Sequence, residues 1–282
     1  MVIDLHVHSN MSDGTDTPAE LARAAALGGV DVIGLCDHDT MAGVPQATRA
    51  GAACGVAVLG GVEASTALGG VTVHLLGYGC DPADAALSAA LARVRSAREQ
   101  RVPLMVDALQ RAGLPITVED VRATAARGAT LGRPHVADAL VAIRAVADRR
   151  EAFDVWLDQG KPGYVGHYRI PLDRGIALIH EAGGVAVLAH PWGHGTRGVL
   201  TGGIIASLAR DAGLDGIEAF HNDHDAAARR ELTAIAEANE LLVTGSSDYH
   251  GLGKTGHPLG CNTTSEWVYD AILALISMRR TP

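Results

Sequence analysis

Short apolar runs that carry a histidine or an acidic residue are the feature that most constrains the fold of this chain. The first run is Asp4-Leu5-His6-Val7-His8. Alternate residues of a β-strand share one face, so Asp4, His6 and His8 point the same way. Related runs recur at Asp37-His38-Asp39, Glu63, His74, His190-Pro191 and Asp248-Tyr249-His250. Most of these residues lie at, or just past, the C-terminal end of their run, where a parallel α/β barrel carries its catalytic groups.

The first 80 residues predict alternating strands and helices. Strands are expected at 2–7, 31–36, 56–62 and 71–78, with helices near 18–27 and 45–53. Thr17 as N-cap, Pro18 in the first turn and Glu20 three residues after the cap fit a capping box, and Gly28-Gly29 fits the end of that helix. This alternation favours a largely parallel sheet.

The alternation stops in the middle of the chain and then returns. Residues 82–163 are rich in Ala and Arg and predict consecutive helices, with breaks at Gly113, Gly128-Ala129 and Gly132-Arg133-Pro134. After this segment we expect helices at 172–182, 225–238 and 265–278, and strands at 185–188, 216–220 and 241–244. The sequence therefore predicts a barrel formed by 1–81 and 164–282, with 82–163 as a helical insertion or cap.

Composition excludes several classes of protein. The chain has 282 residues, 48% of them hydrophobic, which is enough for one barrel-sized core or for two modest domains. A formal net charge of −9 argues against a broad nucleic-acid-binding surface, although bound metals could still attract an anionic substrate. The four cysteines are scattered, the N-terminus lacks a signal-peptide pattern, and no apolar stretch is long enough to span a bilayer. We expect a cytoplasmic protein, and we predict neither membrane association nor a protein partner.

The repeated residues have the chemistry of metal ligands. Nine candidate ligands follow from the pattern: His6, His8, Asp13, His38, Glu63, His74, His190, Asp248 and His250. One ion needs three or four protein ligands, so nine residues suit two or three ions. Imidazole and carboxylate ligands without thiolate favour Mn, Fe or Zn. Glu63 is the natural bridging carboxylate, and Asp4, deeper in its strand, is expected to orient a ligand or to be structural.

The order His-x-His, Asp, Asp-His-Asp, Glu, His, His-Pro and Ser-Asp-x-His resembles the PHP (polymerase and histidinol phosphatase) superfamily over residues 1–80 and about 180–260. The resemblance implies a distorted (β/α)7 barrel with three divalent ions, for which we favour Mn. Within the superfamily, the chain most resembles the nucleoside 3′,5′-bisphosphate phosphatases and the 5′-3′ exoribonucleases. The segment Gly132–Ala137 in the cap is part of this resemblance. It also implies three ligand groups: His6, His8, Glu63 and Asp248; Glu63, His74 and His190; Asp13, His38 and His250.

Further candidates concern substrate binding and proton transfer. The predicted substrate-binding residues are Arg98, Arg101, Arg133, His135, Lys161, His38 and His250, with Arg133 favoured because arginine suits bidentate phosphate contacts. His194 is a candidate general acid or a loop histidine. Glu218 is expected near the rim, and either His221 or His224 could line the site. We predict structural or surface roles for His167, His180 and His257.

The resemblance predicts a metal-dependent phosphoric monoester hydrolase that removes the 3′-phosphate of nucleoside 3′,5′-bisphosphates. A 5′-3′ exoribonuclease acting on short 5′-phosphorylated RNA and a histidinol phosphate phosphatase are the alternatives. A non-catalytic barrel should lack several metal positions, yet none is missing here. An amidohydrolase of similar ligand pattern should carry a metal-bridging lysine, and we find no suitable one, because Lys161 lies between Gly160 and Pro162.

Overall fold

The computed structural model describes residues 1–125 and 131–280, except for the side chain of His194. The chain forms two compact units, one made of Met1–Leu91 and Arg169–Pro282 and the other of Ala92–Tyr168. Helix α3 (Ala85–Arg111) begins in the first unit and ends in the second. The predicted helix break at Gly128-Ala129 lies outside the described residues.

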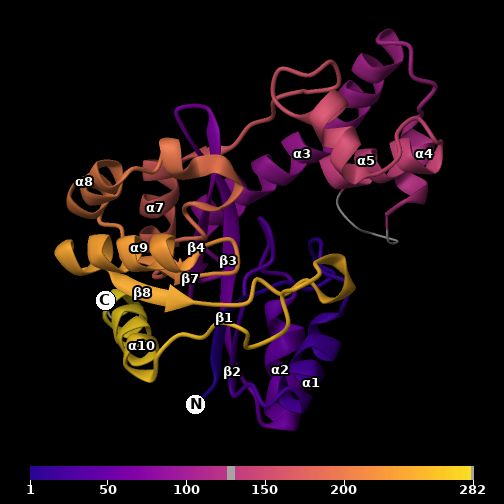
Figure 1. Ribbon diagram of the computed structural model, residues 1–282. Coiled ribbons are helices and arrows are strands. Elements are labelled where there is room, and N and C mark those ends of the chain that lie inside the picture. Colours follow the sequence, from indigo (N-terminus) through magenta and orange to yellow (C-terminus); the bar gives the residue numbers. More distant parts are fainter. Residues whose placement is uncertain (126–130, 281–282) are drawn as a thin grey trace. The chain divides into compact units, whose positions relative to one another are not determined.

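The first unit is built on an eight-stranded sheet with the order β1-β2-β3-β4-β6-β7-β8, and β5 pairs with β3 (Figure 1). The strands are β1 (Ile3–Val7), β2 (Val32–Leu35), β3 (Ala57–Leu68), β4 (Val71–Tyr78), β5 (Ile170–Pro171), β6 (Val185–Leu188), β7 (Gly216–Phe220) and β8 (Leu242–Gly245). Beyond β8, the Asp248 N–H donates to the His6 carbonyl (2.9 Å) and the His8 N–H donates to the Tyr249 carbonyl (2.8 Å). These bonds bring the two ends of the sheet together, so the predicted barrel is nearly closed.

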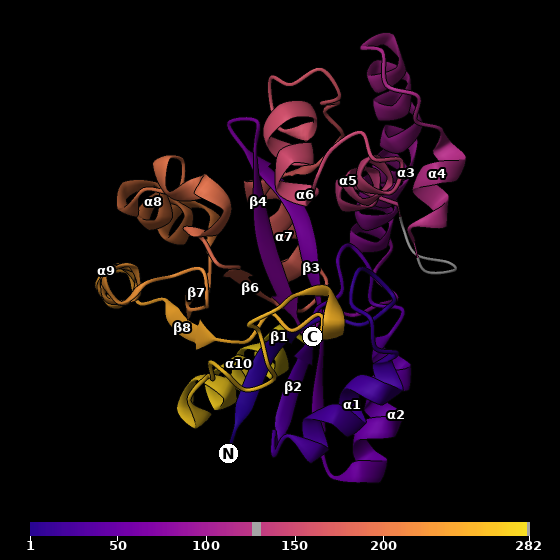
Figure 2. The same ribbon diagram turned by 45° about the vertical axis from the view of Figure 1, so that its right-hand side comes forward.

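One strand departs from the parallel arrangement. Strand β4 is antiparallel to both of its neighbours, β3 and β6, whereas the other pairs along the sheet are parallel. The turn between β3 and β4 is Gly69-Gly70, and both glycines have positive φ (57° and 83°), which is the requirement of a tight hairpin turn. Figures 1 and 2 show the two strands side by side as a long hairpin. The expectation that β3 ends at residue 62 was therefore wrong, and Glu63 lies inside a strand.

Helices pack against the strands of this sheet. Those of the first unit are α1 (Pro18–Leu27), α2 (Val44–Cys54), α7 (Leu172–Glu181), α8 (Gly202–Ala212), α9 (Ala226–Ala238) and α10 (Glu266–Arg280). The predicted capping box of α1 is confirmed: Thr17 Oγ1 accepts from the Glu20 N–H, and the Glu20 side chain accepts from the Thr17 N–H. Helices α1 and α2 lie side by side next to β2 in both views (Figure 2). Helix α8 and strand β5 were not predicted.

Close packing of β1 against β2 positions His6 and His8. Ile3, Leu5 and Val7 on β1 are fully buried, and Gly34 on β2 lies so near Leu5 that a Cβ at position 34 would be 2.1 Å from the Leu5 carbonyl oxygen. A side chain at this position would push β1 away from β2. Glycine therefore sets the strand spacing directly below His6 and His8.

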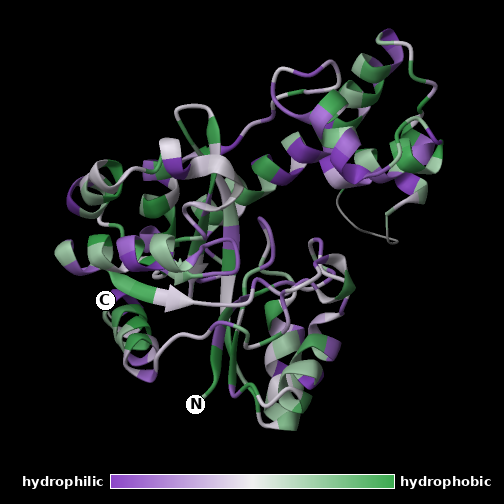
Figure 3. Cartoon of the chain, in the orientation of Figure 1, coloured by the Kyte–Doolittle hydropathy of each residue, from purple (hydrophilic) through white to green (hydrophobic). Residues whose placement is uncertain are grey.

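The second unit is helical. The remainder of α3 is followed by α4 (Val118–Ala123), α5 (Arg133–Ala142), α6 (Arg149–Glu151) and the π-helix η1 (Ala152–Leu157). The predicted break at Gly132 is the N-cap of α5. Buried Met105, Leu109 and Leu140 belong to its own core, and hydrophobic and hydrophilic segments alternate along the helices (Figure 3). Within the described residues, no helix has the length and apolar character needed to cross a membrane.

Candidate metal centre

Five histidines surround the carboxylate of Glu63, which is 1% exposed. Its Oε2 atom lies 3.3 Å from His6 Nε2, 3.2 Å from His8 Nε2 and 3.0 Å from His38 Nδ1. Its Oε1 atom lies 2.8 Å from His74 Nδ1 and 3.1 Å from His190 Nε2. The two oxygens thus face different sets of imidazoles, which is the arrangement a bridging carboxylate requires.

The antiparallel strand β4 explains how His74 reaches this site. Ser65 on β3 pairs with His74 on β4, and Glu63 pairs with Leu76. Glu63, Ser65 and His74 therefore lie on the same face of the hairpin. His74 lies inside its strand rather than at its end. His6 lies on β1 and His8 directly follows it, and the other histidines come from the segments after β2, β6 and β8.

Asp248 is the second buried carboxylate of the centre. Its Oδ1 atom lies 3.2 Å from His8 Nε2 and 3.7 Å from His6 Nε2. Its Oδ2 atom lies 3.2 Å from His221 Nε2 and accepts a hydrogen bond from Lys254 Nζ at 2.5 Å. Asp248 therefore lies between two sets of side chains: Oδ1 faces His6 and His8, and Oδ2 faces His221 and Lys254.

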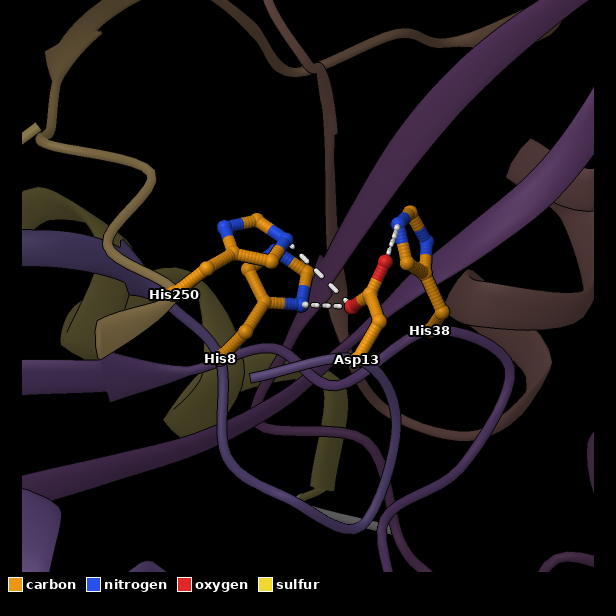
Figure 4. Close-up of side chains that lie close together, drawn as sticks. All are labelled: His8, Asp13, His38 and His250. Atoms are coloured by element: carbon orange, nitrogen blue, oxygen red, sulfur yellow. Dashed lines mark ion pairs between the residues drawn. The ribbon is translucent and has the colours of Figure 1, made fainter. Parts of the chain in front are cut away.

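The carboxylate of Asp13 faces three histidines, His8, His38 and His250 (Figure 4). Its Oδ1 atom lies 3.3 Å from His250 Nε2 and 3.8 Å from His8 Nδ1, and its Oδ2 atom lies 3.7 Å from His38 Nε2. The Asp13 side chain is 44% exposed, so this is the open side of the centre. All nine predicted ligands are thus brought together in the first unit.

Buried carboxylates outside the cluster hold the loops that carry it. Asp37 accepts hydrogen bonds from the Ser9 N–H (2.8 Å), the Ser9 hydroxyl (2.7 Å) and the Ser12 hydroxyl (2.7 Å). These bonds fix the loop that leads from β1 to Asp13. Asp39 has a positive φ of 55° and accepts from the Ser65 N–H (2.7 Å) and hydroxyl (2.9 Å). His38 lies between the two carboxylates, so its backbone is held from both sides.

Glu218 on β7 holds two of the histidines. Its Oε1 atom lies 3.1 Å from His6 Nδ1, and its Oε2 atom accepts from the His190 N–H at 2.8 Å. Ser246 also donates to Oε1. A carboxylate on Nδ1 favours the tautomer with a proton there, which leaves the lone pair of His6 Nε2 facing the centre. The sequence placed Glu218 near the rim, and the structure gives it this orienting position.

The carboxylates of the centre are strongly ionised. Burial alone would raise the pKa of Glu63 and Asp248, but the surrounding histidines outweigh it, so both pKa values lie well below the usual carboxyl range. Burial lowers the pKa of His38 to about 3. Burial also opposes protonation of His8, yet Asp248 and Glu63 raise its pKa to about 10. Divalent ions would take the place of such protons, because metal ligands must be deprotonated.

The residues present fit divalent cations. His6 Nε2 and His8 Nε2 lie 2.9 Å apart, so two ring nitrogens point at one another in a buried site. Asp248 Oδ1 and His38 Nδ1 are buried and have no hydrogen-bond partner among the residues that the structure describes. Groups of imidazole and carboxylate atoms lie within 4.8 Å of one another, including His8 with Asp13, and Glu63 with His74. Unpaired polar atoms that converge in this way are the donor set of Mn, Fe or Zn.

The predicted substrate residues Arg98, Arg101, Arg133, His135 and Lys161 belong to the second unit. Arg101 is 6% exposed, donates to the Val165 carbonyl and lies over the Tyr164 ring. Arg133 Nη1 lies 3.6 Å from Asp158 Oδ1, and Arg133 Cζ lies 5.6 Å from the centre of the Phe153 ring.

His135 Nδ1 accepts from the Gly132 N–H. Arg98 is half-buried on α3, and Lys161 is exposed. His194 lies in the short helix η2 (Gly193–Gly198), and its side chain is outside the described part of the chain.

Sequence reasoning missed one charged residue at the site. Lys254 lies against Asp248, and attraction to this carboxylate outweighs burial and raises the pKa of the ammonium group. His221 and His257 form a group with Asp248, although His257 was expected to be structural or at the surface. These residues follow β7 and β8 on loops, and no periodic pattern in the sequence marks them.

Comparison with known proteins identifies relatives along almost the whole chain. Residues 4–114 match the PHP domain family. The chain is 36% identical over 258 residues to a 3′,5′-nucleoside bisphosphate phosphatase of Chromobacterium violaceum, which covers 92% of this chain and 90% of that protein. It is 34% identical over 247 residues to a 5′-3′ exoribonuclease of Haemophilus influenzae, covering 88% and 89%. It is also 34% identical over 262 residues to a phosphoribosyl 1,2-cyclic phosphate 1,2-diphosphodiesterase of Eggerthella lenta, covering 91% and 97%.

Two solved structures share the fold. A protein of Bifidobacterium adolescentis assigned as a metal-dependent phosphoesterase superimposes with a TM-score of 0.88 at 36% identity, covering 97% of this chain and 96% of that one. A protein of Chromobacterium violaceum described as an amidohydrolase, with bound sulfate and no metal, gives a TM-score of 0.83 at 33% identity, covering 98% and 97%. The barrel and the helical segment are therefore shared with experimentally determined structures.

Proposed function

This chain belongs to the PHP domain family and is a metal-dependent phosphoesterase, and on that premise we propose that it removes the 3′-phosphate of nucleoside 3′,5′-bisphosphates to give the 5′-nucleotide. The observation that carries the proposal is the 36% identity to a 3′,5′-nucleoside bisphosphate phosphatase over 92% of the chain. The cluster around Glu63 supports it, because phosphoryl transfer depends mainly on positioning and on charge stabilisation.

The relatives narrow the substrate class. Their names refer to a nucleoside bisphosphate, to RNA and to a phosphoribosyl cyclic phosphate. Each of these is a phosphate ester of a ribose ring. We therefore propose that the substrate of this chain contains a phosphorylated ribose. We further propose that the same ribose carries a second phosphate.

We assign the nine ligands to three divalent ions, with Mn favoured. One group is His6, His8, Glu63 and Asp248, a second is Glu63, His74 and His190, and the third is Asp13, His38 and His250. The contacts of the two Glu63 oxygens with different histidines support this grouping. Divalent ions held there would supply an activated water nucleophile at neutral pH and offset the charge of the phosphoryl oxygens.

The protein's own residues fix the geometry of this chemistry. Glu218 orients His6 and the backbone of His190. Asp37 holds the loop before Asp13, on the open side of the centre, where a substrate has access. Our proposed contacts for the second phosphate are the second-unit residues Arg98, Arg101, Arg133, His135 and Lys161. We propose His194 as the residue that protonates the leaving group.

A second candidate is 5′-3′ exoribonuclease activity on short 5′-phosphorylated RNA. The 34% identity to an exoribonuclease over 88% of the chain favours it. The net charge of −9 restricts this activity to short ends, because a long RNA needs an extended basic surface. The same centre could hydrolyse either a terminal phosphate or a phosphodiester.

The test is a substrate panel with manganese-loaded protein. Adenosine 3′,5′-bisphosphate, 3′-AMP, a 5′-phosphorylated tetraribonucleotide and histidinol phosphate are compared at equal concentration, and products are identified by chromatography. We expect 5′-AMP and phosphate from the bisphosphate, with slower turnover of 3′-AMP because it lacks the 5′-phosphate. Turnover of histidinol phosphate without any release from the bisphosphate would overturn the proposal. Glu63→Gln serves as the inactive control.

A further inference from the structure

Lys254 is one of two lysines among the 23 basic residues of the chain, and it lies beside the metal centre. Its ammonium donates to Asp248 Oδ2 at 2.5 Å, while Asp248 Oδ1 faces His8 Nε2 at 3.2 Å. One carboxylate thus separates the ammonium from the converging histidines. Lys254 belongs to the first unit, as do all nine proposed ligands.

The ammonium has hydrogen-bonding capacity to spare. Its three N–H groups form a single hydrogen bond, that to Asp248, within the described part of the chain. The side chain is 25% exposed, so the remaining donors can reach solvent. These donors are free to bind a ligand that enters from the solvent beside Asp248.

The loop that carries Lys254 is fixed on both sides. Before it, the Leu252 N–H donates to Thr15 Oγ1 (2.9 Å), and Gly251 has a φ of 64°. A Cβ at position 251 would lie 2.0 Å from Thr15 Oγ1, so only glycine permits this contact.

After Lys254, Asn222 Nδ2 donates to the Gly256 carbonyl (2.6 Å), and His257 Nδ1 lies 2.7 Å from the Ser247 carbonyl oxygen. Contacts with three other segments, at Thr15, Asn222 and Ser247, hold the loop that carries the ammonium in place before any ligand arrives. A preformed position of this kind reduces the entropy lost on binding.

We propose that Lys254 binds an oxygen of the phosphoryl group that the enzyme transfers, and that Asp248 holds the ammonium in position for it. A compact ammonium group with free N–H donors is well suited to a phosphoryl oxygen. The proposal rests on the phosphoesterase function, but it is independent of which nucleoside the substrate carries. Lys254 would act together with the ions and would add a fixed positive charge that remains when they exchange.

The test uses manganese-loaded protein and inorganic phosphate, which is the product of any phosphatase reaction. Calorimetry measures the affinity for phosphate, and elemental analysis after gel filtration measures bound manganese. We expect Lys254→Met to bind phosphate about tenfold more weakly, which corresponds to about 1.4 kcal/mol, with unchanged manganese content. Lys254→Arg should recover part of the affinity. Arg210→Met, which removes an exposed positive charge on α8, is the matched control and should have no effect.

Two results would overturn the proposal. One is an unchanged phosphate affinity in Lys254→Met protein that retains its manganese. The other is a loss of manganese that accounts for the loss of phosphate affinity, because this would mean that Lys254 only positions Asp248. If Lys254→Met does not fold, Lys254→Gln is measured in the same way. Failure of the nucleotide panel with normal phosphate binding would leave this proposal standing and reject only the proposed substrate.

Discussion

Replacing Glu218 by glutamine should weaken metal binding without removing any ligand. The pKa of Glu218 is about 2: burial would raise it, but the neighbouring histidines, His6 first, outweigh burial and hold the carboxylate ionised. It therefore only accepts hydrogen bonds, and it accepts from His190 N–H and Ser246 and faces His6 Nδ1. A glutamine side chain has one accepting oxygen, so it cannot satisfy all three donors.

Both orientations of the amide carry a cost. If its oxygen faces His6, its NH2 group meets the His190 N–H, and an unpaired buried donor costs about 1–3 kcal/mol. If its NH2 group faces His6 Nδ1, the imidazole must move its proton to Nε2, which removes the lone pair that faces Glu63. Loss of an outer partner of this kind typically lowers metal affinity about 10- to 100-fold. We expect Glu218→Gln to fall in that range.

The assay is a competition between the protein and a chelator of known manganese affinity, with circular dichroism to confirm the fold. Glu237→Gln is the matched control, because it makes the same chemical change at an exposed position on α9. Manganese affinity equal to that of the unmodified protein, in folded Glu218→Gln, would refute the argument that this carboxylate sets the His6 tautomer.

Three further outcomes follow from the packing and charge of the first unit. Asp215→Asn should lower the free energy of unfolding by about 2 kcal/mol at neutral pH, because Asp215 accepts two hydrogen bonds from Arg279 (2.6 and 2.8 Å). Burial raises the pKa of Asp215, but His180 and Arg279 outweigh it and the net shift is downward. This stabilisation should therefore be fully present above the ordinary carboxyl pKa and be lost as the pH falls below it, through the lowered pKa of Asp215. Urea titrations of both proteins across pH measure it, and a difference that grows in acid would contradict it. Gly34→Ala should destabilise the protein by about 3 kcal/mol or leave it unfolded, because its Cβ would meet the Leu5 carbonyl oxygen; thermal unfolding is the measurement, and an unchanged midpoint would be the contrary result. Removal of metal by a chelator should abolish phosphate release while the circular dichroism spectrum persists, because the barrel has its own apolar core; loss of the helical signal together with activity would show instead that the ions hold the fold.

The sequence predicts the elements of the barrel well where local chemistry decides them. Thr17 and Glu20 form the capping box that their spacing indicates, and β4 spans the predicted residues 71–78. The nine candidate ligands also stand out in the sequence, because core packing does not require histidines and carboxylates near the ends of so many apolar runs. Strand direction was not evident: Gly69-Gly70 makes β4 antiparallel, and this depends on a turn of two residues.

Interactions between distant segments could not be predicted from local patterns. Glu218 reaches His6 across 212 positions of the chain, and Lys254 reaches Asp248 through a loop without regular structure. Asp37 was noted as part of the Asp-His-Asp motif, yet its role as an acceptor for Ser9 becomes evident only once β1 and β2 pair. Such partners depend on the nearly closed barrel, which brings these segments together.

The most direct test of the central claim is a manganese titration of metal-stripped protein, with phosphate release from adenosine 3′,5′-bisphosphate followed at each step. We predict no release without metal, recovery that requires more than one equivalent of manganese, and 5′-AMP as the nucleotide product. Glu63→Gln should stay inactive at saturating manganese, because both sides of the centre share this carboxylate. Phosphate release by the stripped protein, or full activity of Glu63→Gln, would contradict a multinuclear centre built around Glu63.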